Sequence, residues 1–522
     1  MSQAEVVVKP SPLQRVLDGI ERVGNKVPHP VIIFLILIAF IMVLSAIFQA
    51  AGSTVTFEQA QIGAEEPVTV TVAAQSLLDA DGLRFVFTSP VANFNNFGVV
   101  GVIVVAMIGV GMAEEVGLIA SFIKRLVKVT PPRAITFIIV LLGVLSSIAT
   151  DAGYLVLIPL SAAVFLSLGR HPLAGLAAAF AGVGGGFAVN MLITPVDGML
   201  AEITNEAIAD PSQHVSITGN LYFGIVSTLL VTVVVTFLTE KFVEPRLGTY
   251  HPSEGPDTAD EAPSGELSAE EKNGLRWAFW GFLGTTAVVL ALSLPPNALL
   301  RNPETGSLIE DSPLLNSIIF LILVYFFVMG LCYGRGAGTV KGSMDVINPM
   351  VKTISGLSGL IFLLLVISQF IAYFNYSNLG TIAAVNMADA LEAANLSTVW
   401  LILGLIAMTA VIDIFIGGVV PKWAIFAPVF VPLFIQLGIS PDLAMAAYRV
   451  GDSPVNVATP LMPYFALIVI FAERYRKKVG VGSVISLMLP YTVVLLVTWS
   501  ALLVVWYLLG LPLGPGASIY LS

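Results

Sequence analysis

The chain has 522 residues, of which 57% are hydrophobic and only 11% are charged. A soluble globular domain carries about 25% charged residues, so this composition excludes a soluble globule and predicts a polytopic helical membrane protein. The net charge of −10 is concentrated in loops, and we expect a lipid bilayer but no nucleic acid as a partner. The single cysteine, Cys332, and four histidines without metal-ligand spacing predict no disulfide and no metal cluster.

The first half of the chain is predicted to occupy residues 1–247. An amphipathic segment over 13–27 should lie along the membrane surface, and transmembrane spans are expected at 31–51 and 97–116. Basic residues follow the second span between 124 and 133, and the positive-inside rule places them in the cytoplasm. The N-terminus is then cytoplasmic as well.

Residues 133–170 form an apolar block with basic residues at both ends and a polar centre, SSIATDAG. Each arm of about 14 to 18 residues would extend about 21 to 27 Å, which is less than the hydrocarbon core of about 30 Å. We therefore expect a re-entrant hairpin that enters from the cytoplasm and stops near the midplane. Two short complete spans are the alternative.

From residue 172 the chain is predicted to cross outward as a broken helix over 172–200. The apolar run there is interrupted by three glycines, 184–186, and by Pro195. A continuous span at 221–238 returns to the cytoplasm. The next stretch, 248–273, is rich in Pro, Ser, Gly and acidic residues, which is typical of a linker between two halves.

The second half, 274–522, repeats this plan. Its predicted elements are three spans, a hairpin that enters from outside, a broken helix and a last span, at 277–294, 314–333, 350–374, 399–437, 442–473 and 485–509. Acidic flanks indicate that this hairpin enters from outside. The layout is an all-α fold with nine transmembrane helices and two re-entrant hairpins, and it leaves the C-terminus outside.

The two halves match in sequence around their broken helices. The dipeptide VN followed by TP occurs at 189–195 and again at 455–460. Since one unit starts inside and the other outside, they form an inverted repeat, which in secondary transporters places the substrate near the midplane where the repeats meet. We expect hairpin tips and breaks to converge there, with Asn190 and Asn456 among the substrate ligands.

The second broken helix carries Arg449 and Asp452 one helical turn apart. Charges at membrane depth cost roughly 2.5 to 3.5 kcal/mol each on insertion scales, and they usually line a cavity. The planar fork of Arg449 suits a substrate carboxylate. A structural pair between Arg449 and Asp452 is the alternative.

Four carboxylates at hairpin tips or helix breaks are candidates for ion or proton coupling: Asp151, Asp197, Asp413 and Asp452. Asp197 is alternatively a helix cap after Pro195, and Asp413 alternatively pairs with Lys422 across the hairpin. Trp423, beside the second tip, can stack on an aromatic substrate, with core packing as the alternative.

Several strings of the sequence together carry a resemblance: PHP before the first span, DAGYLVLIPLSA, LGRHPLAGLAAAFAGV, AAYRVGDS, TPLMPYF and the terminal LGLPLGPGA. In these strings the chain resembles the AbgT family, the p-aminobenzoyl-glutamate transporters, whose members include exporters of sulfonamide antimetabolites. The resemblance implies a homodimer related to the divalent-anion symporters, in which each subunit has a dimer-forming scaffold and a transport part. The family's functional positions fall on Asp197, Trp423, Pro441, Arg449, Asp452 and Pro460.

The chain departs from this family at its tips and breaks. The family's second tip reads N-L-x-x-G-S-x-S-A-[KQ]-W, whereas this chain has Asp413 in place of the asparagine. Hydroxyls are absent at five positions where relatives usually have them: Gly184, Ala188, Gly418, Val420 and Val455. Since sodium at a broken helix is held by several oxygens, we expect proton coupling in which Asp413 takes part. A sodium ion near Asn190, Ser453 and Asn456 is the alternative.

The sequence therefore predicts an ion-coupled secondary active transporter of the bacterial inner membrane that works by an elevator-like alternating-access mechanism. The expected substrate is p-aminobenzoyl-glutamate or a related p-aminobenzoate compound such as a sulfonamide, and the direction of transport stays open. A proton- or sodium-coupled symporter of citrate or C4-dicarboxylates is the alternative. No GxSxG or HExxH motif supports an enzyme, no repeated filter sequence supports a channel, and no cofactor is expected.

Overall fold

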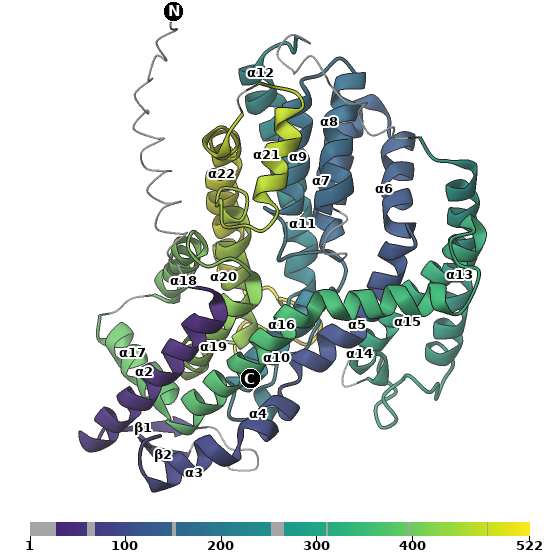
Figure 1. Cartoon of the computed structure of the whole chain (residues 1–522). Coiled ribbons are helices and arrows are strands. Elements are labelled where there is room, and N and C mark those ends of the chain that lie inside the picture. Colours follow the sequence, from purple (N-terminus) through teal and green to yellow (C-terminus); the bar gives the residue numbers. More distant parts are fainter. Residues whose placement is uncertain are drawn as a thin grey trace, which may run out of the picture.

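The computed structural model describes residues 28–59, 68–148, 153–251, 266–308, 312–394, 397–477 and 479–521. The predicted surface segment 13–27 and the tip residue Asp151 lie outside these residues, as does most of the predicted linker. Within them the chain is a helical membrane fold with one small β-hairpin, and its helices form two groups (Figure 1). We call these groups the scaffold and the transport part.

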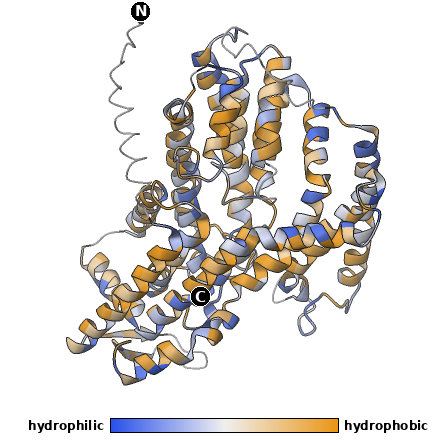
Figure 2. Cartoon of the chain, viewed as in Figure 1, coloured by the Kyte–Doolittle hydropathy of each residue, from blue (hydrophilic) through white to orange (hydrophobic). Residues whose placement is uncertain are grey.

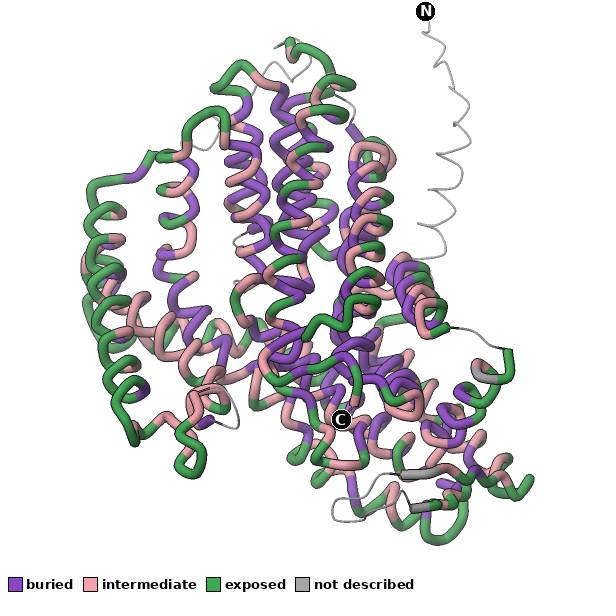
Figure 3. Tube along the Cα trace, turned by 180° about the vertical axis from the view of Figure 1, so that it is seen from behind, coloured by how far each residue is buried: buried purple, intermediate pink, exposed green. Residues whose placement is uncertain are grey.

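The scaffold is a row of long helices: α2 (Pro30–Ala50), α5 (Val99–Glu115), α13 (Ala269–Ser293), α15 (Ile318–Ala337) and α16 (Met344–Tyr376). α13 packs on α15, α15 on α5, α5 on α16 and α16 on α2. Large apolar side chains of these helices are exposed, among them Ile36, Phe279 and Trp280. Figure 2 shows these helices as largely hydrophobic, and Figure 3 shows much of the outermost ones as exposed. Apolar side chains that face outward suit lipid, so the scaffold presents a surface to the bilayer.

The transport part contains the two predicted hairpins, the two broken helices and two further helices. The hairpins are α7 (Ile135–Leu145) with α8 (Ile158–Ser167), and α18 (Thr398–Asp413) with α19 (Val419–Gln436). The broken helices are α9 (Pro172–Val183) with α10 (Pro195–Glu206), and α20 (Pro441–Asp452) with α21 (Phe465–Glu473), and the further helices are α11 (Leu221–Leu238) and α22 (Val481–Leu508). α9 packs on α7 and α8, and α20 packs on α18 and α19. Every residue of α9 and α20 is buried. Each half therefore places the first arm of a broken helix inside its own hairpin.

The helix breaks have local causes in the sequence. α10 begins at Pro195, and Thr194 and Asp197 form a capping box that satisfies free N–H groups of the helix start. In the second half α20 ends at Asp452, directly before Ser453 and Pro454. Because proline has no N–H donor and crowds the preceding turn, it stops an apolar helix that would otherwise continue. The backbone groups freed at the two breaks are then available for contacts within the transport part.

Two glycines allow close packing and a tight turn in the transport part. A Cβ atom on Gly182 of α9 would lie 2.7 Å from the carbonyl oxygen of Val140 on α7, so only glycine lets these helices touch. Gly418, between α18 and α19, has a φ of +87°, which residues with a side chain rarely adopt. It turns the chain at the tip of the second hairpin.

By length and composition, seven helices of the described residues are candidate membrane spans, or nine if each of two bent helix pairs counts as one span. The bent pairs are Pro90–Asn96 with Val99–Glu115, at 46°, and Leu118–Val129 with Pro132–Ile148, at 119°. The predicted span 31–51 corresponds to α2, and most other predicted spans agree equally well with single helices. The chain is therefore a multi-pass helical membrane protein, and the finer layout of nine spans with two re-entrant hairpins stays a prediction.

Elements that were not predicted from the sequence cap one end of the molecule (Figure 1). Strands β1 (Thr54–Gln59) and β2 (Val68–Ala73) pair antiparallel and contact α17 (Leu379–Ala393). Asp79 caps the following helix by accepting the Gly82 N–H at 2.8 Å, and this hydrogen bond lowers the pKa of the Asp79 carboxyl group. The remaining helices are α3 (Ala80–Thr88), α4 (Pro90–Asn96), α6 (Leu118–Val129), α12 (Glu244–Leu247) and α14 (Pro313–Asn316).

Candidate functional site

The two helix breaks of the transport part contact each other directly. The Ala188 N–H of the first break donates to Ser453 Oγ at 3.0 Å, and Arg449 Nη1 donates to the Ala188 carbonyl oxygen at 2.9 Å. These contacts join positions that are 265 and 261 residues apart in the chain. The breaks of the two halves thus form a single polar centre.

Each break is also bonded to a hairpin tip. Asn190 Nδ2 donates to the Val144 carbonyl oxygen at 3.2 Å and to Ser147 Oγ at 3.0 Å, next to the end of α7. In the second half Thr459 Oγ donates to the Ile414 carbonyl oxygen at 3.2 Å, just after α18. The Asn190 amide, predicted to bind substrate, therefore satisfies backbone and hydroxyl oxygens of the first tip.

Arg449 forms an ion pair with Asp197, and not with Asp452. Its Nη1 lies 2.5 Å from Asp197 Oδ1, and the two side chains are 3% and 14% exposed. Asp197 uses its other oxygen to accept the Thr194 N–H at 2.7 Å, so it is both a helix cap and the arginine's partner. The predicted alternative pair with Asp452 is wrong because Arg449 reaches across to the first break. The Nε of Arg449 is buried and has no hydrogen-bond partner among the described residues.

Lys422 lies between two carboxylates at the second hairpin. Its Nζ is 2.7 Å from Asp452 Oδ1 and also forms an ion pair with Asp413. All three residues are fully buried, and Tyr448 donates its hydroxyl to Asp452 Oδ1 at 3.1 Å. The structure thus contains the Asp413–Lys422 contact that the sequence offered as an alternative, and Asp452 joins it. Two carboxylates and one ammonium give this group, which we call the Lys422 cluster, a formal charge of −1.

Trp423 packs inside the transport part. Its Nε1–H donates to Thr204 Oγ1 at 3.0 Å, and its ring lies 4.8 Å from that of Tyr448. The side chain is fully buried, so in this conformation core packing occupies the ring that was expected to stack on substrate. A substrate would reach it only if α10 or α19 moved.

The remaining predicted residues lie around the same centre. Pro441 is the first residue of α20 and is buried, whereas Asn456 and Pro460 are half-buried in the second break. Ser453, offered as a sodium ligand, accepts the Ala188 N–H. Asp151 cannot be compared because it lies outside the described residues.

A small cavity adjoins the Arg449–Asp197 pair, and it shares one lining residue with a much larger cavity. The smaller, lined by both residues together with Asn190, has a volume of about 10 Å³, which is at the lower limit for one water molecule. The larger, of about 1070 Å³, lies between α10 and the scaffold helices α5 and α15 and is lined by Glu202, His214 and Asp442. Ile217 lines both cavities. The polar centre is therefore closed, and the side chain of Ile217 lies between it and the larger cavity.

Two polar residues of this region escaped the sequence analysis. Tyr448 lies four residues before Asp452, and this i, i+4 spacing was available as a signal. Asp442 belongs to the acidic flanks from which the second hairpin was predicted to enter from outside, but its side chain is buried, where it accepts from Ser440. Its position directly after Pro441 marks a helix start, where a carboxylate is favoured even when buried.

Comparison with known proteins gives consistent matches over the whole chain. Residues 15–521 match the AbgT putative transporter family. The chain is 36% identical over 500 residues to the p-aminobenzoyl-glutamate transport protein of Escherichia coli (strain K12), covering 95% of both chains.

The chain is also similar to two solved structures. The Alcanivorax borkumensis YdaH transporter has a TM-score of 0.86 and 42% identity, and the match covers 94% of this chain and 100% of that one. Neisseria gonorrhoeae MtrF, described as illuminating a class of antimetabolite efflux pumps, has a TM-score of 0.88 and 40% identity, with 96% and 100% coverage.

Proposed function

The chain belongs to the AbgT transporter family, and from this premise we propose that it is a secondary active transporter of p-aminobenzoyl-glutamate or related p-aminobenzoate compounds, including sulfonamides. The name of the E. coli relative and the description of MtrF support this substrate class. The single observation that carries the proposal is the ion pair of the buried Arg449 with the half-buried Asp197 where the two breaks meet. Buried charges at the crossing of two broken helices are typical of substrate and ion sites in secondary transporters.

Arg449 is the substrate's carboxylate ligand in this proposal. Asp197 occupies one edge of the guanidinium, and the buried Nε is unpartnered among the described residues. Nη2 donates only to the weak acceptor Met445 Sδ, at 3.7 Å. A substrate carboxylate can therefore bind by replacing Asp197 or by accepting from Nε, and either arrangement gives charge-assisted hydrogen bonds. The cavity of about 10 Å³ does not hold such a molecule, so binding requires α10 to separate from the scaffold or from α20.

The test is Arg449→Lys, which keeps the charge but loses the planar fork. Binding of p-aminobenzoyl-glutamate to purified protein should weaken at least tenfold, which is about 1.4 kcal/mol, while Arg276→Lys on the exposed surface of α13 serves as the control. Undiminished affinity would leave Arg449 as a structural partner of Asp197 only. Displacement of bound ligand by citrate or succinate, but not by p-aminobenzoyl-glutamate, would favour a dicarboxylate symporter instead.

Protons are the coupling ions in this proposal, and the Lys422 cluster carries them. The cluster has one carboxylate more than it has cations and is fully buried. A buried net charge of −1 is unfavourable, so the cluster favours binding one proton or one small cation. The loss of hydroxyls at Gly418, Val420 and Val455 removes oxygen ligands that sodium would use.

Transport into proteoliposomes should follow an imposed pH gradient in the absence of sodium. Asp413→Asn leaves a matched Lys422–Asp452 pair and should weaken that dependence. Flux that needs sodium and ignores the pH gradient would overturn proton coupling while leaving the substrate assignment intact. Counterflow with both gradients imposed gives the direction of transport.

The mechanism we propose is an elevator-like movement of the transport part against the scaffold of a homodimer in the inner membrane. It is supported by the contacts that join both breaks into one body, and by the large cavity between α10 and the scaffold. A Cβ on Gly198 of α10 would lie 2.5 Å from Val102 Cγ1 of α5. In a Cys332→Ala background, cross-linking Gly198→Cys to Val102→Cys should stop transport, whereas cross-linking Gly274→Cys to Ala337→Cys within the scaffold should not. Transport by the cross-linked first pair would refute movement at this boundary.

A further inference from the structure

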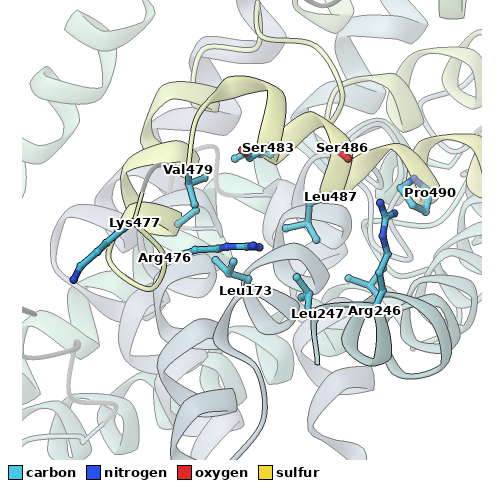
Figure 4. Close-up of a pocket in the computed structure, with 13 residues that line it drawn as sticks. Leu173, Arg246, Leu247, Arg476, Lys477, Val479, Ser483, Ser486, Leu487 and Pro490 are labelled. Atoms are coloured by element: carbon cyan, nitrogen blue, oxygen red, sulfur yellow. The ribbon is translucent and has the colours of Figure 1, made fainter. Parts of the chain in front are cut away.

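A third cavity, of about 450 Å³, lies at the end of the transport part that the basic residues predict to be cytoplasmic (Figure 4). It lies between the first residues of α9, residues 243–247 with α12, the end of α21 with the residues after it, and the start of α22. Arg246 and Arg476 line it together with Ser483 and Ser486. We call it the basic cavity.

The basic cavity has an excess of positive charge. None of its 13 lining residues is acidic. Neither Arg246 nor Arg476 has an ion pair among the described residues, although nearby Arg170 binds Glu244 at 2.5 Å. Figure 4 shows Arg476 extending across the cavity and Arg246 rising from the other side, while Lys477 points away. Two guanidinium groups that line one cavity without a carboxylate among its lining residues favour binding of an anion.

The walls of the same cavity are apolar. Leu173, Val243, Leu247 and Leu487 line it beside the two arginines. The helical surface that continues from these walls is exposed and hydrophobic, with Phe242 49% and Leu489 40% exposed. A soluble anion would gain nothing from such walls, whereas a molecule with an anionic head and an apolar tail fits both parts of the cavity.

We propose that the basic cavity binds an anionic phospholipid of the cytoplasmic leaflet, with the phosphate between Arg246 and Arg476 and an acyl chain along the apolar walls. Ser483 and Ser486 lie where hydroxyl donors can complete the phosphate's hydrogen bonds. The bound lipid would bridge α12, which ends the first half of the chain, to α21 and α22 of the second half. This site is independent of the transport substrate and of the coupling ion.

The experiment is lipid binding to the purified full-length protein, followed by native mass spectrometry and by the lipid-induced change in melting temperature. Phosphatidylglycerol should bind in preference to phosphatidylcholine. The double variant Arg246→Gln/Arg476→Gln should bind phosphatidylglycerol roughly thirtyfold more weakly, from the attraction of anionic lipid to two basic residues. The matched control is Arg276→Gln/Arg335→Gln, which removes two exposed arginines of the scaffold at the same end of the molecule and should leave binding within about twofold.

A conservative variant keeps the test valid if the double variant folds poorly. Arg246→Lys/Arg476→Lys preserves both charges and should retain most of the lipid binding. Equal binding of the two lipids would overturn the proposal, as would undiminished phosphatidylglycerol binding in the Gln variant. Displacement of the lipid by millimolar inorganic phosphate or by p-aminobenzoyl-glutamate would assign the cavity to a soluble anion instead.

Discussion

Lys422→Gln should strongly destabilise the protein, because it leaves the carboxylates of Asp413 and Asp452 buried without a cation. Lys422 is fully buried and forms ion pairs with both. Breaking a buried ion pair by removing one partner costs about 3 to 5 kcal/mol. Asp413→Asn alone leaves a matched pair of Lys422 and Asp452 and should change stability by less than about 1 kcal/mol.

A double-mutant cycle measures whether these residues act together. Because the second substitution removes one of the two repelling carboxylates, the double variant Lys422→Gln/Asp413→Asn should be more stable than Lys422→Gln alone by about 1 to 3 kcal/mol. The assay is reversible unfolding of purified protein in mixed micelles, with Lys272→Gln on the exposed start of α13 as the control.

A loss of less than about 1 kcal/mol for Lys422→Gln, which is the range of an exposed ion pair, would contradict a buried ion pair at Lys422. Simple addition of the effects of Lys422→Gln and Asp413→Asn would contradict it as well. Additive effects would mean that Asp413 and Lys422 do not interact in the folded protein.

Three further predictions concern packing, a salt bridge and access to the centre. Gly182→Val should lower the melting temperature, at a cost of about 1 to 3 kcal/mol, because α7 and α9 must separate; an unchanged melting temperature would contradict the close contact. Arg170→Gln leaves the partly buried Glu244 carboxylate without its partner at 2.5 Å and should lower the free energy of unfolding by about 1 to 3 kcal/mol in the same assay; an unchanged free energy of unfolding would indicate that the pair is fully solvated. Ile217→Ala should join the two cavities, so Asn190→Cys, in a background without other cysteines, should react faster with a polar thiol reagent; equal rates would show that another group closes the centre.

The helices were predictable because long apolar runs are interrupted by residues that break helices. The break before α10 follows from glycines 184–186 and Pro195, and the break after α20 from Pro454. The β-hairpin was missed although β2 alternates Val and Thr, because no element was predicted between the spans 31–51 and 97–116. Composition thus located the elements inside the membrane better than those outside it.

The candidate site was predictable by residue type but not by partner. Arg449, Asp197 and Asp452 were recognised as charges at helix breaks, yet the only side-chain partner that the sequence offered for Arg449, as an alternative, was Asp452. The observed partner, Asp197, lies 252 residues away. Such a pairing depends on how the two broken helices cross, and local spacing carries no information about that. Lys422 and Asp413 are nine residues apart in a tight hairpin, so their contact was within reach of the sequence.

The formal charge of the Lys422 cluster has an electrical consequence if the transport part moves across the membrane. Moving one elementary charge through the full membrane potential changes its energy by about 2.3 kcal/mol per 100 mV. With one proton bound, the cluster is neutral and voltage does no work on it. Without the proton it carries −1, and a negative cell interior drives it toward the outer face, where a proton can be taken up. The membrane potential would then act on the cluster only in its proton-free form, and the charge of a bound substrate carboxylate would add its own contribution.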